Sequence, residues 1–290
     1  MTLASELAQA TRRLLEAGVP DAALDAEWLL ADALGIDRAT LFVRREEALD
    51  DEIAERFARA LDRRVKREPL QHVLGEQEFY GRRFRCDRRA LIPRQETETL
   101  IDAALALPEH LGAPLERGPR VCDAGTGTGC IAITLAAERP DWAVDAVDAS
   151  ADALALAEAN IAAHGVESQV TLQKLRFDEL LRRAGAYDLI VSNPPYIAES
   201  EWETLQPEVR DFDPREALVS GQTGLEAYGE LARVAWVALH PGGYLVLEVG
   251  FGQARLVERI LGDRGFRETA TRNDLSGVER VVVGQRPGRG

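Results

Sequence analysis

Apolar residues recur every three to four positions through the first 68 residues of the chain. This spacing places the apolar side chains on one face of a helix, and it is clearest in residues 3–18, 21–35 and 51–67. Gly18 and Gly35 stand at the ends of the first two segments, where helices commonly stop. We therefore predict a small N-terminal helical domain over residues 1–68 and expect it to recognise the substrate.

The pattern changes after Pro69. EFYG (78–81) and RRFRCD (82–87) predict two short strands with Gly81 at their turn. The helical period returns within PRQETETLIDAALAL (93–107), whose acidic residues Glu96 and Glu98 lie in the first turn. We interpret residues 69–93 as a β-hairpin linker and residues 94–290 as a second domain.

From Arg120 onward, short apolar runs alternate with segments of helical period. Strands are predicted at 121–125, 143–149, 170–173, 187–192, 244–250 and 280–285. Such alternation produces a mostly parallel sheet with helices on both faces. The predicted fold class is α/β, with a Rossmann-like sheet that follows the helical domain and the hairpin.

Composition narrows the class of protein. The 290 residues carry a formal net charge of −14 and are 46% hydrophobic, which is typical of a globular protein. No apolar run reaches the roughly 18 residues of a membrane span, and the N-terminus has no signal-peptide core. The three cysteines form no CxxC pair and the four histidines are scattered. We expect a cytoplasmic, monomeric protein with no disulfide, metal or membrane partner.

The acidic charge also argues against a general nucleic-acid binder, because affinity for phosphate backbones depends on Lys and Arg. The charge is uneven, however: residues 56–94 contain twelve basic and five acidic side chains. This basic segment is either a solvated surface of the helices and hairpin or a patch that docks an acidic partner.

A glycine-rich loop, DAGTGTG (123–129), joins the first predicted strand of this domain to its helix. Glycines let a ligand approach the backbone, and the helix start offers unpaired N–H groups. The spacing is GxGxG, and Cys130 stands where a dinucleotide fingerprint has its third glycine. The loop therefore suits a smaller ligand that presents a carboxylate, although a tight turn without a ligand is the alternative. The candidate cofactor-binding residues are Gly125, Thr126, Gly127, Thr128 and Gly129.

Two further strand ends carry candidate chemistry. Asp148 ends the second strand, where an acid binds the ribose hydroxyls in nucleotide-binding α/β folds; the alternative is a helix cap, for which Ser150 is better placed. SNPPYI (192–197) follows the buried run YDLIV. Two consecutive prolines cannot extend a strand. Because the strands are parallel, all these ends meet at one edge of the sheet.

The combined pattern resembles class I S-adenosylmethionine-dependent methyltransferases. Asn193–Tyr196 looks like the [SND]PP[YFW] motif of enzymes that methylate a planar nitrogen, and the chain resembles the release factor glutamine methyltransferases nearly throughout. The matching segments are 68–81, 91–98, 123–136, 147–150, 192–197, 213–218, 224–228, 241–253 and 274–282. The resemblance implies S-adenosyl-L-methionine as cofactor, and methyl transfer to the side-chain amide N5 of the glutamine in the GGQ motif of peptide chain release factors, in support of translation termination.

The chain departs from the family in two places. Gln95 stands where the family usually has proline. In QKLRF (173–177), Leu175 occupies the place of an acid near the adenine, and Arg176 follows it. Arg176 is a candidate cofactor contact, and Asp178 is the acid that would substitute after a shift of the loop.

The chemistry of an amide suggests roles for the tetrapeptide. The nitrogen lone pair is delocalised, so reaction requires positioning of the nitrogen and acceptors for both of its hydrogens. Asn193 offers a side-chain oxygen and Pro194 a backbone oxygen, Pro195 stiffens the turn, and the Tyr196 ring can pack on the amide. The resemblance implies the same catalytic and substrate-binding assignments, with Asn193 also at the cofactor.

Other functions share parts of this pattern. A ribosomal-protein glutamine methyltransferase or a DNA or RNA amino-group methyltransferase would also carry NPPY. A nucleotide-binding protein without catalysis would keep the glycine loop and Asp148. An NAD-dependent oxidoreductase fits poorly because the third glycine is missing.

Overall fold

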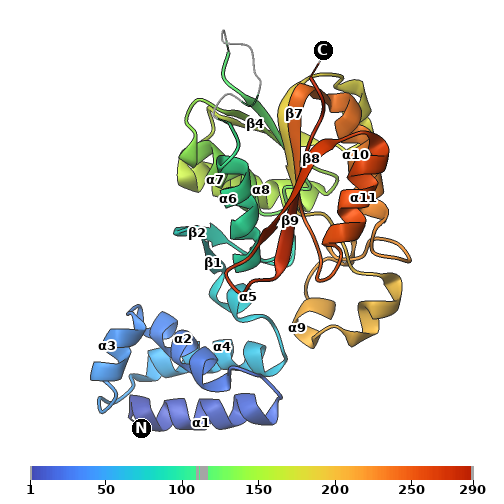
Figure 1. Ribbon diagram of the computed structural model, residues 1–290. Coiled ribbons are helices and arrows are strands. Elements are labelled where there is room, and N and C mark those ends of the chain that lie inside the picture. The colour runs from blue at the N-terminus through green and yellow to red at the C-terminus, as the bar shows by residue number, and fades with distance from the viewer. Residues whose placement is uncertain (1, 109–110, 112–116, 289–290) are drawn as a thin grey trace. The chain divides into compact units, whose positions relative to one another are not determined.

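The computed structural model describes residues 2–108, 111 and 117–288 (Figure 1). Its contacts divide the chain into two compact units. The first comprises the residues up to Glu76 together with Gln206–Phe212, and the second comprises Gln77–Leu205 and the residues from Asp213 onward. The boundaries predicted at residues 68 and 93 stay predictions, because a division by contacts does not locate the ends of independently folding domains.

The first unit is helical, as predicted. Its helices are α1 (Leu3–Glu16), α2 (Ala22–Leu34), α3 (Arg38–Val43), α4 (Asp51–Val65), α5 (Leu70–Leu74) and α9 (Pro207–Arg210). The start of α1 is capped by the Thr2 hydroxyl, which accepts from the Ser5 N–H at 3.2 Å. Helix α2 ends at Gly35, whose φ of 67° suits a residue without a β-carbon. Leu14, Leu29 and Phe57 are buried in the shared core.

A buried ion network ties α9 into this unit. The Arg64 guanidinium lies 2.7 Å from an Asp25 carboxylate oxygen and 3.0 Å from Glu208, and only 6% of the Arg64 side chain is exposed. Arg67 makes two further hydrogen bonds to the Glu208 carboxylate. Glu208 therefore anchors a helix that is distant in sequence from the rest of the unit.

The second unit begins with the predicted hairpin, formed by β1 (Glu76–Phe79) and β2 (Arg82–Arg85). Its two turn residues both have positive φ angles, 51° at Tyr80 and 69° at Gly81. Positive φ at both positions matches the two-residue turn preferred by twisted hairpins. Phe79 and Phe84 project from the strands into the core of the unit.

Among the described residues, seven strands form the main sheet in the order β5-β4-β3-β6-β7-β9-β8. The strands are β3 (Arg120–Ala124), β4 (Ala143–Asp148), β5 (Val170–Lys174), β6 (Tyr187–Ser192), β7 (Leu239–Glu248), β8 (Arg267–Asn273) and β9 (Glu279–Gln285). Strands β3 to β7 run parallel, whereas β9 is antiparallel to β7 and to β8. The predicted Rossmann-like α/β fold is confirmed.

Strand β8 was not expected from the sequence. Its residues RETATRN are charged and mostly exposed, because β8 lies at the edge of the sheet and pairs only with β9. Edge strands commonly carry charged side chains that discourage pairing with other chains. The apolar pattern that reveals a buried strand is therefore absent from this segment.

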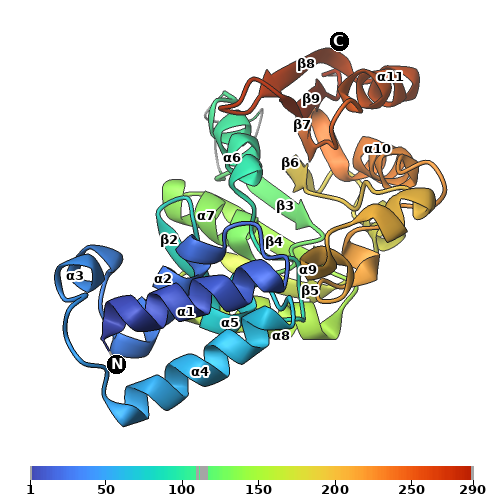
Figure 2. The same cartoon turned by 90° about the horizontal axis from the view of Figure 1, so that it is seen from below.

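Helices cover both faces of the sheet (Figure 2). One face packs against α6 (Glu98–Leu105), α7 (Cys130–Glu138) and α8 (Ala151–His164), and the other against α10 (Glu226–Ala238) and α11 (Ala254–Arg264). Short 3₁₀ turns complete the unit: η1 (Gln95–Thr97), η2 (Phe177–Arg182), η3 (Glu199–Thr204) and η4 (Arg215–Ala217).

The strand order places a crevice at a definite position. The chain proceeds from β3 to β4 on one side and reaches β6 on the other, so the order reverses next to β3. Ligands in open α/β sheets bind at the carboxyl ends of the strands at such a switch point. The carboxyl ends of β3, β4 and β6 carry the glycine loop, Asp148 and Asn193.

Within the described residues, the structure contains no helix that is both long enough and apolar enough to span a bilayer.

The ion network predicts a large stability effect at Arg64. Arg64→Met keeps most of the apolar stem but leaves the Asp25 carboxylate buried without its cation, which costs about 3 kcal/mol of unfolding free energy. Urea unfolding of the full chain, followed by circular dichroism, measures the loss. Arg13→Met is the matched control, because its pair with Asp62 is exposed and contributes at most about 1 kcal/mol. Equal effects of the two substitutions would contradict the account.

Candidate active site

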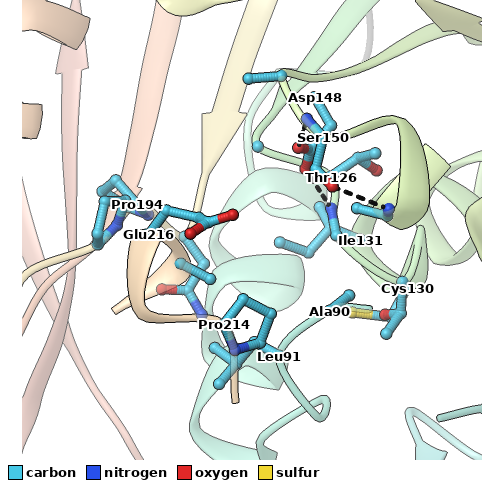
Figure 3. A pocket seen from close by; sticks show the side chains of 18 of the residues that line it. Ala90, Leu91, Thr126, Cys130, Ile131, Asp148, Ser150, Pro194, Pro214 and Glu216 are labelled. Carbon is cyan, nitrogen blue, oxygen red and sulfur yellow. Dashed lines mark hydrogen bonds between the residues drawn. The ribbon is translucent and has the colours of Figure 1, made fainter. Parts of the chain in front are cut away.

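A cavity of about 490 Å³ opens at the carboxyl edge of the main sheet, within the second unit (Figure 3). Asp148 and Thr126 lie on one wall, and Pro194 and Glu216 lie on the opposite wall. The volume lies within the range of small-molecule sites. The residues that line it include Arg94, Thr97, Gly125, Thr126, Gly127, Thr128, Ile131, Asp148, Leu175, Arg176, Phe177, Asn193, Pro194, Pro195, Pro214 and Glu216.

The glycine loop follows β3 as predicted. The Gly125 and Thr126 N–H groups donate to the Val147 carbonyl at 2.9 and 3.0 Å, which ties the loop to β4. Gly129 has a φ of 83°, and a β-carbon there would lie 3.2 Å from the Ala157 methyl group. Glycine is thus required both for the turn and for the close approach of α8. Gly129 does not line the cavity, whereas the four residues before it do.

Asp148 supports the same loop from the end of β4. One carboxylate oxygen accepts from the Gly127 N–H at 3.0 Å, and the other accepts from the Ser150 N–H at 2.9 Å. Ser150, not Asp148, caps α8 by accepting from the Ala153 N–H at 3.2 Å. Each Asp148 oxygen keeps a lone pair for a ligand in the cavity.

Asp123 is the buried support beneath the loop. Its side chain is inaccessible to solvent, and Oδ2 accepts from the Thr126 hydroxyl at 2.6 Å and from the Ala132 N–H at 3.1 Å. Burial raises the pKa of this carboxyl to about 7, against the lowering effect of those two hydrogen bonds.

The tetrapeptide stands where β6 ends. The Ser192 hydroxyl donates to the Ala124 carbonyl at 2.5 Å, so the ends of β6 and β3 are held together. Asn193 follows at once, and its Nδ2 donates to the Thr97 hydroxyl at 3.2 Å. Asn193, Pro194 and Pro195 all line the cavity.

Tyr196 lies behind this wall. It is not among the lining residues; its ring packs against the core on the α10 side of the sheet. Burial raises the pKa of its hydroxyl to about 12, and the negative charge of Glu248 adds to the rise. The Tyr196 carbonyl accepts from Gln253 Nε2 at 3.0 Å, and Gln253 Oε1 accepts from the Tyr228 hydroxyl at 3.0 Å. These bonds fix the backbone of the tetrapeptide.

The segment that departs from the family lies beyond β5. Arg176 lines the cavity, but 76% of its side chain is exposed and it forms a 3.4 Å ion pair with Asp178. Asp178 is not a lining residue. The apolar contacts come from Leu175 and Phe177, whose ring lies against Gly125.

Sequence reasoning did not select Phe177 or Glu216 as site residues. A signal existed for both, because they belong to QKLRF (173–177) and to DPREAL (213–218), a segment that matches the family. Arg94, which lines the cavity, forms a 3.0 Å ion pair with Asp213, the first residue of DPREAL. This pair ties the residues before η4 to the residue before η1. Burial raises the pKa of Asp213 to about 6, and the positive charge of Arg94 opposes the rise.

No group of three His, Cys, Asp or Glu side chains in the described parts of the chain is arranged to hold a metal ion. Hydrogen-bond acceptors at the ends of β4 and β6, the start of α7 and an apolar patch all line this cavity. Such an arrangement suits a ligand with hydroxyls, a carboxylate and a flat ring.

Comparisons with known proteins find relatives that match nearly the whole chain. A family model described as "PrmC N-terminal domain" matches residues 6–75, and one described as "Methyltransferase small domain" matches residues 98–260. A release factor glutamine methyltransferase from Geobacter sulfurreducens is 43% identical over 94% of this chain and 92% of its own length. Its counterpart from Cereibacter sphaeroides is 45% identical over 99% of each chain.

The chain belongs to the release factor glutamine methyltransferase family. The resemblance noted from residues 91–98, 123–136 and 192–197 is thereby confirmed. Among solved structures, the hMettl16 catalytic domain in complex with MAT2A 3′UTR hairpin 6 superposes with a TM-score of 0.54 at 14% identity, over 69% of this chain and 74% of that one. At this low identity, the likeness supports only the methyltransferase fold.

The buried Asp123 predicts a pH effect on stability. Since its pKa is about 7 in the folded chain and 3.8 ordinarily, the folded state holds a proton that the unfolded state has lost between these values. Stability therefore falls as pH rises through this window, by about 1 kcal/mol per pH unit. Asp123→Asn removes the titrating group, so the unfolding free energy of the parent should fall relative to the variant from about pH 5 to about pH 7. Urea unfolding at each pH measures the difference, and parallel curves would contradict the account.

Proposed function

We propose that this chain transfers a methyl group from S-adenosyl-L-methionine to the side-chain amide nitrogen of the glutamine in the GGQ motif of peptide chain release factors. Membership in the release factor glutamine methyltransferase family supports the substrate class. The observation that carries the chemistry is that Asn193 and Pro194 line the cavity, with Pro194 on the wall opposite Thr126 of the glycine loop (Figure 3). Such a substrate requires the enzyme to act in the cytoplasm, where translation takes place.

The residues of the cavity fit this cofactor. Asp148 has lone pairs available for the two ribose hydroxyls, and the start of α7 behind Thr128 suits a carboxylate. Leu175 and Phe177 offer an apolar surface for the adenine, with Arg176 at its exposed rim. When bound, S-adenosylmethionine supplies a methyl group on a positively charged sulfur.

The tetrapeptide then binds and orients the glutamine amide that receives the methyl group. Asn193 Oδ1 and the Pro194 carbonyl each accept one hydrogen of the glutamine amide, which favours the positive charge that develops on the nitrogen. Proline fixes φ, so the backbone that carries both acceptors is held in place before the substrate arrives. After transfer, the nitrogen loses a proton to solvent and needs no dedicated base.

Tyr196 and Pro195 support this arrangement in our proposal. Gln253 holds the Tyr196 carbonyl at 3.0 Å, so the backbone of the motif is fixed from the side away from the cavity. Pro195 lines the cavity and limits how the substrate amide can lie. Stacking of the Tyr196 ring on that amide stays a prediction. In this structure the ring packs against the core and does not line the cavity.

Removal of the Asn193 acceptor tests the function directly. The parent protein, mixed with S-adenosylmethionine and a purified release factor, should add one methyl group to the GGQ glutamine, located by fragmentation of the peptide in a mass spectrometer. Asn193→Ala should lower kcat about 100- to 1,000-fold because one transition-state acceptor is lost. Cofactor affinity, measured by calorimetry, should change little.

Two results would contradict this assignment. Full activity of Asn193→Ala would remove the proposed role of the side chain. A parent protein that binds the cofactor but methylates no release factor would redirect the search to ribosomal proteins and nucleic acids as acceptors.

Asp148 provides a second test, at the cofactor. Asp148→Ala should weaken S-adenosylmethionine binding by about 10- to 100-fold, because hydrogen bonds to a charged acceptor are lost. Asp152→Ala is the matched control, since Asp152 is an exposed acid in the next turn of chain and does not line the cavity. Calorimetric titration measures both, and equal affinities would refute the ribose assignment.

A further inference from the structure

Thr97 connects the catalytic tetrapeptide to a buried acid on another strand. Thr97 ends η1 and is 2% exposed, and its hydroxyl accepts from Asn193 Nδ2 at 3.2 Å. Glu248, the last residue of β7, follows Leu247, which pairs with Ser192 directly before Asn193. The Thr97 side chain lies close enough to the Glu248 carboxyl to lower its pKa as a hydrogen-bond donor. Glu248 is also 2% exposed. Glu248, Thr97 and Asn193, from separate parts of the sequence, thus form one chain of interacting side chains that reaches the cavity wall at Asn193.

The Thr97 hydroxyl has no competing task in the helix that follows. Thr97 stands at the N-cap of α6, yet its side chain makes no capping hydrogen bond. Its backbone is helical, with a φ of −67° and a ψ of −18°, because η1 runs directly into α6, so no cap is needed at this position. The hydroxyl is therefore available to Asn193 and Glu248.

The donors and acceptors in this line have only one consistent direction when Glu248 is ionised. A carboxylate accepts only, so the single hydroxyl hydrogen of Thr97 points to Glu248. The Thr97 oxygen must then accept, and the Asn193 group that faces it must be the NH₂. Because the amide is planar, Oδ1 is directed to the other side of Asn193, which lines the cavity.

We propose that Glu248, acting through Thr97, fixes the orientation of the Asn193 amide and keeps its oxygen toward the substrate. The proposal deepens the function above and rests on it for the identity of the substrate. Glu248 and Thr97 are positioning residues: they hold the acceptor in place before the glutamine amide binds.

The surroundings of Glu248 make its charge state part of this device. Burial raises the pKa of its carboxyl to about 7, and the Thr97 hydrogen bond and the positive charges of Arg280 and Arg94 oppose the rise. Its second oxygen, Oε2, has no hydrogen-bond partner among the described residues. The other titratable groups that interact electrostatically with the Glu248 carboxyl are Glu96, Cys130, Tyr196 and Tyr228.

Protonation of Glu248 removes the constraint, because a carboxylic acid can also donate to Thr97. The hydroxyl can then donate to Asn193, and the amide can turn its NH₂ to the cavity, where it cannot accept from the substrate. Activity should therefore rise with pH through the pKa of Glu248.

Kinetics of matched variants test the proposal. Thr97→Val keeps the shape but removes the hydroxyl, and it should lower kcat about tenfold, with the KM for S-adenosylmethionine unchanged. Thr97→Ser should recover most of that loss. Glu248→Gln should lower kcat similarly and remove the rise of kcat near pH 7. Thr134→Val controls for a buried Thr→Val change, since Thr134 is buried on α7 outside the cavity, and it should leave kcat unchanged.

A purely structural role gives a different result. Thr97→Val would then lower the unfolding free energy but leave kcat and its pH profile as in the parent, and the proposal would be overturned. Loss of kcat in Thr97→Ser equal to that in Thr97→Val would also overturn it.

Nuclear magnetic resonance separates this proposal from the proposed function, because it needs no release factor. The Asn193 side-chain amide signals, assigned by their absence in Asn193→Ala, should shift with pH with a midpoint near 7 in the parent. The shift should vanish in Thr97→Val and in Glu248→Gln. A shift that persists in both variants, or none in the parent, would overturn the proposal even if release factors are methylated.

Discussion

The strand β6 leaves the sheet at Ser192, and the hydroxyl of that residue fixes the exit by donating to the Ala124 carbonyl at 2.5 Å. Ala124 is the last residue of β3, directly before the glycine loop. This hydrogen bond, at the end of the β3–β6 pairing, therefore sets the distance between the tetrapeptide and the loop. Two prolines follow, so the backbone beyond Asn193 has little freedom to relax away from that position.

Buried carboxyl groups support this edge of the sheet from below. Asp123 holds the glycine loop, Asp213 holds Arg94, and Glu248 faces Thr97. In each case burial raises the pKa, so these positions destabilise the charged form of the group. Carboxyl groups that lower the stability of the fold in this way are common at functional sites, where the position of a side chain matters more than its contribution to stability.

Much of the site could be predicted from the sequence because it depends on short-range patterns. Apolar runs predicted β3, β4 and β6, and the ends of parallel strands must share an edge, so the glycine loop, Asp148 and Asn193 were expected to meet. The relation of Thr97 to Asn193 was not predictable in this way, since 96 positions separate the two residues and the contact depends on where η1 lies. The edge strand β8 lacks an apolar pattern, and α9 joins the helical unit through the ion pairs of Glu208 with Arg64 and Arg67.

The central claim is that Asn193 Oδ1 and the Pro194 carbonyl together receive the two hydrogens of a glutamine amide. A crystal structure with S-adenosylhomocysteine and a GGQ peptide measures this most directly. The account predicts that the amide nitrogen lies within about 3.2 Å of both oxygens, the range of N–H···O hydrogen bonds. A bound glutamine whose amide nitrogen contacts neither oxygen would contradict it.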